Sequence, residues 1–226
     1  MILSALGKPA KGVCRDPVPP VRLPASPMIP APRADLIARR NGGVCWQALA
    51  DWEPVLFSAD GLRLEEWHSE GRMCVVKYGA HRTVSHVAVP QGAFYVKLYR
   101  RDRLPDAAGH LVRPSAARRE WLKLAEVARR GIPTVRPLAW AEHVRGGLVR
   151  DNYLITEAIE PARSLEHHLS DELPRLPPGV RHSMRREILQ STARFVAAIH
   201  QAGVLHDDFH AGNVLVRARP GGGDDA

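Results

Sequence analysis

The chain has 226 residues, a formal net charge of +8 at pH 7, 45% hydrophobic residues and 25% charged residues. These values are typical of a globular protein with a substantial core, arranged as one domain or as two small ones. They argue against a membrane-spanning protein, because no apolar run approaches the roughly 18 uncharged residues that a spanning helix needs.

The positive charge comes mostly from arginines that are spread along the chain. They form neither an aromatic-interleaved patch nor a recognition helix, so we do not expect specific nucleic-acid binding as the main role. Anionic substrates or an anionic membrane face fit the same charge. The N-terminus lacks the apolar segment of a secretory signal, and the three scattered cysteines form no CxxC pair. Both features favour a cytoplasmic protein with reduced thiols.

The first part of the chain differs in composition from the rest. Residues 1–34 contain eight of the nineteen prolines, which predicts a disordered arm. Residues 44–57 give a mixed signal that includes a short helix. Three segments that follow are rich in Val, Phe and Tyr and bounded by Gly or Pro, which predicts successive antiparallel strands at residues 72–79, 82–90 and 92–100.

The clearest short helix is predicted to begin at Ser115, as its N-cap, and to end at Gly131 and Pro133. Its apolar face is expected to carry Trp121, Leu124, Ala125 and Ala128. Residues 137–144 and 152–160 flank a glycine-containing turn and predict a further hairpin.

A short helix is expected at residues 164–173, and a long amphipathic helix at residues 180–203. The apolar side of the long helix carries Met184, Ile188, Phe195, Val196 and Ile199. A strand is expected at residues 213–218. This order predicts an α+β fold of two unequal lobes: a small antiparallel sheet with one helix at residues 44–160, and a partial, mainly helical lobe at residues 161–226.

Short polar side chains gather in the sequence GVLHDDFHAGNVLV, between the long helix and the last strand. His206, Asp208 and Asn213 match the spacing H-x-D-x-x-x-x-N. Phosphoryl transfer explains this spacing, because an Asp must take the proton of the acceptor hydroxyl while a nearby oxygen ligand holds Mg²⁺ against the nucleotide phosphates. We therefore predict a catalytic loop in which Asp208 is the base, Asn213 binds Mg²⁺ and His206 holds the loop backbone.

The same chemistry requires a Lys on a strand, which reaches the α- and β-phosphates, and a Glu on the following helix, which holds that Lys. Lys97 lies between apolar residues in FYVKLYR, and Glu120 lies in the predicted helix that follows. Lys77, in the predicted strand at residues 72–79, is the alternative to Lys97. A solubilising edge-strand lysine and a surface glutamate are the competing interpretations of the pair.

Four segments resemble the lipopolysaccharide kinase family that phosphorylates Kdo or heptose, within the protein-kinase-like superfamily. They are YVKLYR, ARREWLKLAEVARRGIPTVRPLAWAE, LITEAIE and HDDFHAGNVLV, and the resemblance covers roughly residues 70–217. It implies a two-lobed protein-kinase-like fold, with the lobe at residues 44–160 binding nucleotide. It also implies ATP and Mg²⁺ as cofactors.

The resemblance implies further site residues. The backbone from Glu157 to Ile159 is expected to form the hinge that binds adenine. The phosphate-covering turn, KYGAHRTVSH, contains only Gly79 instead of G-x-G-x-x-G, so the backbone at Gly79 and the charge of Arg82 are the expected phosphate contacts. His210 stands where protein kinases usually have Lys, which favours a glycolipid or a small-molecule sugar as acceptor.

The family scaffold carries another Mg²⁺-binding Asp on a strand beyond the catalytic loop, whereas this chain closes with VRARPGGGDDA. We therefore expect a C-terminally truncated, ATP-dependent phosphotransferase for lipopolysaccharide core sugars, cytoplasmic and in peripheral contact with the anionic inner membrane. A degenerate kinase-like protein that binds nucleotide or a partner without turnover is the alternative. A kinase acting on aminoglycosides or on proteins would share the same core residues.

Overall fold

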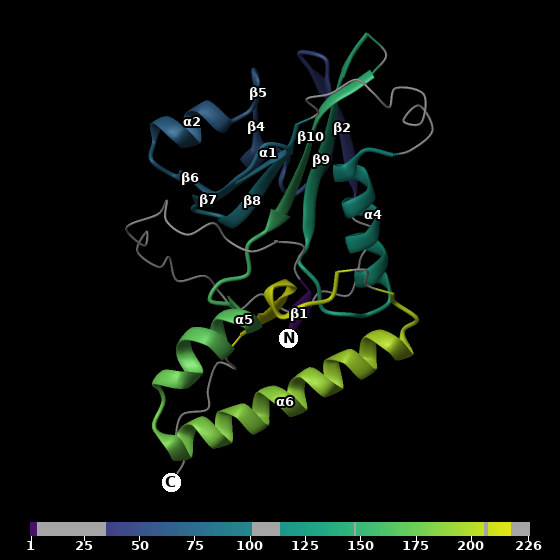
Figure 1. The fold of residues 1–226 in the computed structure, drawn as a ribbon. Helices are drawn as coiled ribbons and strands as arrows, with labels where there is room; N and C mark the ends of the chain where they lie inside the picture. Colours follow the sequence, from purple (N-terminus) through teal and green to yellow (C-terminus); the bar gives the residue numbers. More distant parts are fainter. Residues whose placement is uncertain (4–34, 101–113, 147, 206–207, 218–226) are drawn as a thin grey trace. The chain divides into compact units, whose positions relative to one another are not determined.

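The computed structural model describes residues 1–3, 35–100, 114–146, 148–205 and 208–217 (Figure 1). The chain divides into two compact units. The sheet unit comprises residues 9–129 and 135–158, and the helical unit comprises residues 1–8, 130–134 and 159–226.

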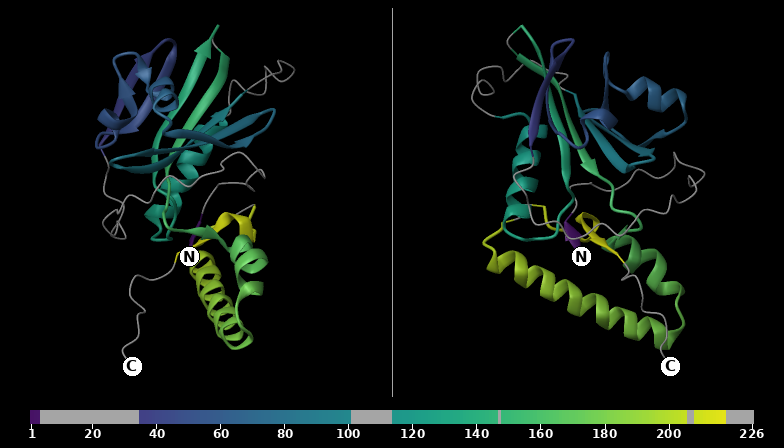
Figure 2. Two further views of the ribbon diagram at one scale, coloured as in Figure 1. Left: turned by 90° about the vertical axis from the view of Figure 1, so that its left-hand side faces the viewer. Right: turned by 180° about the vertical axis from the view of Figure 1, so that it is seen from behind.

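A seven-stranded antiparallel sheet forms the sheet unit, in the order β2-β3-β9-β10-β8-β7-β6, and Figure 2 shows its twist. The strands are β2 (Leu36–Asn41), β3 (Val44–Leu49), β6 (Met73–Tyr78), β7 (Arg82–Val89), β8 (Gly92–Tyr99), β9 (Pro137–Arg145) and β10 (Leu148–Glu157). The three successive strands predicted from β-branched and aromatic residues are confirmed as β6 to β8. The predicted hairpin is confirmed as β9 and β10, and the α+β fold class with its antiparallel sheet is also confirmed.

The β2–β3 hairpin is absent from the sequence-based prediction. The first six residues of the stretch 44–57, where a short helix is expected, form β3, and the helical part is α1 (Glu53–Leu56). The hairpin turn consists of Gly42 and Gly43, whose positive φ angles of 54° and 80° suit a two-residue connection. The signal in the sequence was therefore Asn-Gly-Gly between two short runs, rather than the apolar spacing.

Helix α4 (Ala116–Arg129) packs against β8, β9 and β10 (Figure 1). Ser115 caps it as predicted, because its Oγ accepts a hydrogen bond from the Arg118 N–H at 3.2 Å. The predicted apolar face is buried at Trp121 and Leu124, whereas Ala125 is exposed, since it lies one residue beyond the buried stripe. The chain leaves the helix through Gly131, which has a φ of +74°.

Aromatic side chains cover the opposite face of the sheet. Trp52 and Trp67 both pack edge-on against Phe94 of β8, with ring centroids 5.8 and 5.1 Å away. Trp67 belongs to α2 (Leu64–Ser69), a short helix that the sequence analysis does not predict. A two-stranded ribbon of β4 (Phe57–Ser58) and β5 (Gly61–Leu62) lies between α1 and α2. Because Phe94 and Lys97 are an odd number of residues apart, Lys97 faces α4 instead.

The helical unit contains the long predicted helix, confirmed as α6 (Pro178–Gln201). Its apolar side is buried at Ile188, Phe195 and Ile199, whereas Met184 is 40% exposed. It is preceded by α5 (Leu165–His167), the π-helical turn η1 (His168–Glu172) and the 3₁₀ turn η2 (Leu173–Arg175). After it come the 3₁₀ turn η3 (Ala211–Asn213) and strand β12 (Val214–Val216), where the sequence predicts a strand.

Strand β12 lies between β1 (Ile2–Leu3) and β11 (Arg163–Ser164) in a small antiparallel sheet. The predicted disordered arm therefore begins with an ordered strand, because Ile2 and Leu3 pair with Leu215 and Val214; the rest of the arm lies outside the described residues. In the parts of the chain that the structure describes, no helix combines the length and the apolar character needed to cross a bilayer.

Candidate functional site

Lys97 and Glu120 form a buried ion pair. Lys97 lies on β8, between β10 and β7, and its side chain is completely buried. Its Nζ donates a hydrogen bond to Oε1 of Glu120 on α4 at 2.5 Å, and the Glu120 side chain is 19% exposed. Lys97 is therefore neither an edge-strand nor a surface residue. The structure brings the two residues together as the sequence analysis expects.

The electrostatics of this pair follow from burial. Burial lowers the pKa of Lys97, and the adjacent Glu120 carboxylate opposes the decrease by stabilising the ammonium form. A buried ammonium group without a counter-ion destabilises the fold, and the Glu120 carboxylate offsets this cost for Lys97.

Tyr99 joins the pair, although the sequence analysis does not select it. Its hydroxyl donates a hydrogen bond to Oε2 of Glu120. Burial, followed by the charge of Glu120, raises the pKa of Tyr99 above its usual range. The spacing in the sequence could have indicated Tyr99, since residues 97 and 99 of one strand point to the same face of the sheet.

Arg82 adds positive charge to this face of the sheet. It is opposite Tyr99 in the β7–β8 register. Burial, and then the charge of Arg82, lowers the pKa of Lys77. Lys77 lies on β6, the edge strand of the sheet, whereas Lys97 lies inside it. Gly79 is in the β6–β7 connection, where an added Cβ would lie 3.4 Å from the Arg82 carbonyl oxygen.

The expected adenine-binding segment begins at the end of β10. The Glu157 N–H donates to the Arg136 carbonyl oxygen and the Ala158 N–H donates to the Ala93 carbonyl oxygen, both at 2.8 Å. These two donors are therefore engaged within the sheet unit. Ile159 is the first residue after that unit.

In the helical unit, Asn213 fixes the exposed Asp208. The Asn213 side chain is buried, and its Nδ2 donates to the Asp208 carbonyl oxygen at 2.9 Å and to Asp208 Oδ2 at 3.2 Å. Its Oδ1 has no hydrogen-bond donor within the described segments, which is uncommon for a buried oxygen. This oxygen is a suitable Mg²⁺ ligand. His206 lies outside the described residues.

His210 and Gly212 make the turn compact. His210 Nδ1 accepts a hydrogen bond from the Gly212 N–H at 3.0 Å, and His210 Nε2 lies 3.6 Å from Asp208 Oδ1. A Cβ added to Gly212 would come within 2.8 Å of His210 Cε1 and 2.9 Å of Oε2 of Glu166. Only glycine fits here without displacing a neighbour.

Comparison with known proteins identifies a family whose sequence pattern matches the chain. The sequence pattern of the lipopolysaccharide kinase (Kdo/WaaP) family matches residues 67–225, more than half of the chain. The chain belongs to this family. The resemblance stated from the sequence is thus confirmed, and Lys97, Glu120, Asp208 and Asn213 all lie within the matched part.

Several relatives carry named activities. The lipopolysaccharide core heptose(I) kinase WaaP of Pseudomonas aeruginosa is 26% identical over 137 residues, which are 58% of this chain and 50% of that protein. The 3-deoxy-D-manno-octulosonic acid kinase of Xanthomonas campestris is 32% identical over 99 residues, 44% of this chain and 35% of that protein. A solved structure of WaaP in complex with acyl carrier protein covers 56% of this chain and 45% of its own, with 22% identity and a TM-score of 0.40. The chain therefore spans half or less of the length of these relatives.

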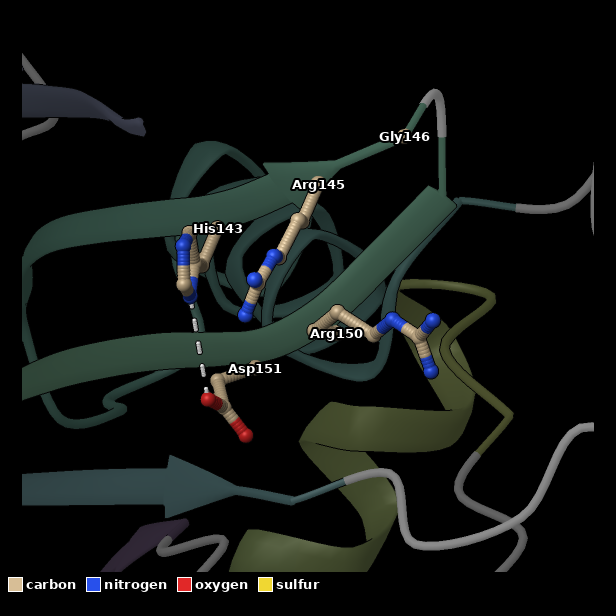
Figure 3. A pocket seen from close by; sticks show the side chains of 5 residues that line it. All are labelled: His143, Arg145, Gly146, Arg150 and Asp151. Atoms are coloured by element: carbon tan, nitrogen blue, oxygen red, sulfur yellow. Dashed lines mark ion pairs between the residues drawn. The ribbon is translucent and has the colours of Figure 1, made fainter. Parts of the chain in front are cut away.

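A separate pocket lies next to the turn of the β9–β10 hairpin. It has a volume of about 410 Å³ and is lined by His143, Arg145, Gly146, Arg150 and Asp151. The His143 and Arg145 side chains extend from β9 towards β10, where His143 Nδ1 lies 3.8 Å from Asp151 Oδ2 (Figure 3). None of the residues predicted from the sequence to form the site lines it.

Proposed function

We propose that the chain provides the nucleotide-binding and catalytic residues of an ATP-dependent kinase that phosphorylates a sugar hydroxyl of the lipopolysaccharide core. The buried Lys97–Glu120 pair carries this proposal. A fully buried lysine is rare, and perturbed buried charges gather at functional sites. The named relatives act on heptose and on 3-deoxy-D-manno-octulosonic acid, which supports a sugar of this class as the acceptor.

In the sheet unit, Lys97 binds the α- and β-phosphates of ATP, and Glu120 fixes the direction of its ammonium group. Arg82 and the backbone at Gly79 add phosphate contacts. The backbone from Glu157 to Ile159 recognises adenine. Since the amides of Glu157 and Ala158 are already engaged, the Ile159 amide is the donor that we assign to adenine.

In the helical unit, Asp208 accepts the proton of the sugar hydroxyl. Asn213 orients it, because two hydrogen bonds from one amide nitrogen fix both the backbone and the carboxylate of Asp208. Oδ1 of Asn213, which accepts no hydrogen bond from the described residues, would hold Mg²⁺, and the ion would neutralise phosphate charge. From its place in the H-x-D-x-x-x-x-N pattern, we assign to His206 the role of holding the loop backbone. His210, in place of a lysine, leaves room for a sugar.

The net charge supports an acidic acceptor and contact with a membrane face, and the scattered cysteines support a cytoplasmic location. A net charge of +8 suits an acidic glycolipid, and we place the protein in the cytoplasm, in peripheral contact with the inner membrane.

The test is calorimetry of Mg·ATP with the 226-residue chain, followed by a phosphate-transfer assay on lipopolysaccharide core acceptors, aminoglycosides and protein. We expect Lys97→Ala to weaken ATP binding at least tenfold, and Lys77→Ala, on the edge strand, to leave it unchanged. Asp208→Ala should leave ATP binding largely intact and lower kcat by a factor of roughly 10² to 10⁴.

Absence of Mg·ATP binding by the unaltered chain would contradict the proposal. Binding without transfer to any acceptor would favour the non-catalytic alternative, and transfer to aminoglycoside or protein alone would replace the sugar acceptor.

A further inference from the structure

Glu120 is held through both of its carboxylate oxygens, and both donors come from β8. Lys97 Nζ donates to Oε1 at 2.5 Å, and the Tyr99 hydroxyl donates to Oε2. A carboxylate with one partner rotates easily about its last bond, because terminal sp³–sp² torsions are broad. A second donor on the other oxygen fixes that rotation, so the direction in which Glu120 meets Lys97 depends on Tyr99.

The helix that carries Glu120 is fixed to the sheet next to this contact. Asn152 is opposite Tyr99 in the β10–β8 register, and its Oδ1 accepts a hydrogen bond from the Ala117 N–H at 2.9 Å. That N–H belongs to the first turn of α4 and has no partner inside the helix. Ala117 and Glu120 are three residues apart and share one face of α4. Tyr99 and Asn152, which are opposite each other in the sheet, thus bind Glu120 and Ala117 at the two ends of one turn of α4.

We propose that Tyr99 is a positioning residue that turns the Glu120 carboxylate towards Lys97 and keeps the phosphate-binding pair assembled before nucleotide arrives. The inference rests on the proposed function, because it gives Tyr99 a part in the phosphate contact. A hydroxyl suits this task better than a second ammonium group. It donates one directed hydrogen bond without adding a buried charge.

The test compares Tyr99→Phe with Tyr153→Phe in the 226-residue chain. Tyr153 is a matched control because it lies on β10 of the same sheet and is half-buried, but it pairs with Leu98 and faces away from Glu120. The first readout is trace acetylation of Lys97 by acetic anhydride without nucleotide, quantified by mass spectrometry. We expect the labelling rate of Lys97 to rise roughly tenfold in Tyr99→Phe, the factor expected for one lost hydrogen bond to a charged group. Tyr153→Phe should label like the unaltered chain.

The second readout is kinetic. Tyr99→Phe should raise KM for ATP roughly tenfold with KM for the sugar acceptor unchanged. A variant that only melts at a lower temperature, with Lys97 labelling and KM for ATP unaltered, would overturn the positioning role. If the unaltered chain does not bind Mg·ATP, the proposed function fails, but the labelling comparison still decides whether Tyr99 holds the pair.

Discussion

Lys97 and Glu120 are buried to different degrees, and this decides what each contributes to stability. The Lys97 side chain is fully enclosed, whereas Glu120 is 19% exposed and keeps a second donor in Tyr99. Removal of Glu120 therefore leaves an ammonium group with neither water nor counter-ion. Removal of Lys97 leaves a carboxylate that still has a partner and some access to water.

We expect Glu120→Leu to lower the free energy of unfolding by about 3–5 kcal/mol, because it leaves a buried charge unpaired. Lys97→Met, which nearly conserves volume, should cost less than about 1.5 kcal/mol. Chemical denaturation of both variants measures the difference, and the double variant should resemble Lys97→Met. Equal losses in the two single variants would show that the burial of Lys97 does not matter.

The same pair gives a pH dependence with a definite sign. Burial lowers the pKa of Lys97 from 10.5, so between its folded value and 10.5 the unfolded chain binds more protons. The contribution of Lys97 to the free energy of unfolding therefore rises with pH in this window. The total rise should be larger and should begin at lower pH in Glu120→Leu, where the opposing carboxylate is absent, and it should disappear in Lys97→Met.

Sequence reasoning finds Lys97 and Glu120 because a lysine inside an apolar strand, followed by a helix with a glutamate, is unusual. It does not find Tyr99, because tyrosine is an ordinary strand residue and only the pairing with α4 gives it a partner. Nor could it find that the Glu157 amide is engaged, since that bond depends on Arg136, which is distant in sequence.

At the scale of elements, the 3₁₀ turn η3 determines where Asp208 and Asn213 meet. Asn213 N–H donates to the His210 carbonyl oxygen at 2.9 Å, and the Gly212 N–H donates to the His210 ring. Both contacts require the chain to pass close to the His210 and Glu166 side chains at Gly212. The geometry of the loop thus depends on one residue without a side chain.

Gly212→Ala should therefore destabilise the helical unit by about 1–3 kcal/mol and lower kcat, because the added methyl group displaces His210 or Glu166. Gly179→Ala is the control: Gly179 lies in α6, and a Cβ there would have no atom within 4 Å. It should be neutral or stabilising by up to about 1 kcal/mol. Thermal melting and phosphate-transfer rates measure both effects, and similar behaviour of the two variants would mean that η3 tolerates a side chain.

Elements with long periodic or β-branched patterns are predictable from this sequence, as α4, α6 and β6 to β10 show. The β2–β3 hairpin and α2 are not, because these short segments mix polar and apolar residues and lack the run of Val, Tyr and other strand-forming residues that marks the equally short β6. They are stabilised by tertiary contacts, such as the packing of Trp67 on Phe94, that local sequence does not contain.

At the scale of the whole molecule, the chain carries an excess of positive charge, mostly from arginine. A charge of +8 is far more than the phosphate contacts of one nucleotide require, and the basic residues are spread through the chain. Charge that is distributed in this way attracts extended anionic surfaces without recognising a particular sequence or shape. A membrane face that carries the proposed glycolipid acceptor is such a surface.

We therefore expect the chain to bind vesicles with about one third anionic lipid at least tenfold more tightly than neutral vesicles at low salt. Each basic residue close to the surface contributes about 1 kcal/mol, so engagement of only two of them is sufficient for this difference. At about 1 M NaCl the Debye length falls to about 3 Å, and binding should be lost. Co-sedimentation with vesicles measures both effects. Binding that is equal on neutral vesicles, or that persists at high salt, would mean that the positive charge serves the soluble substrates alone.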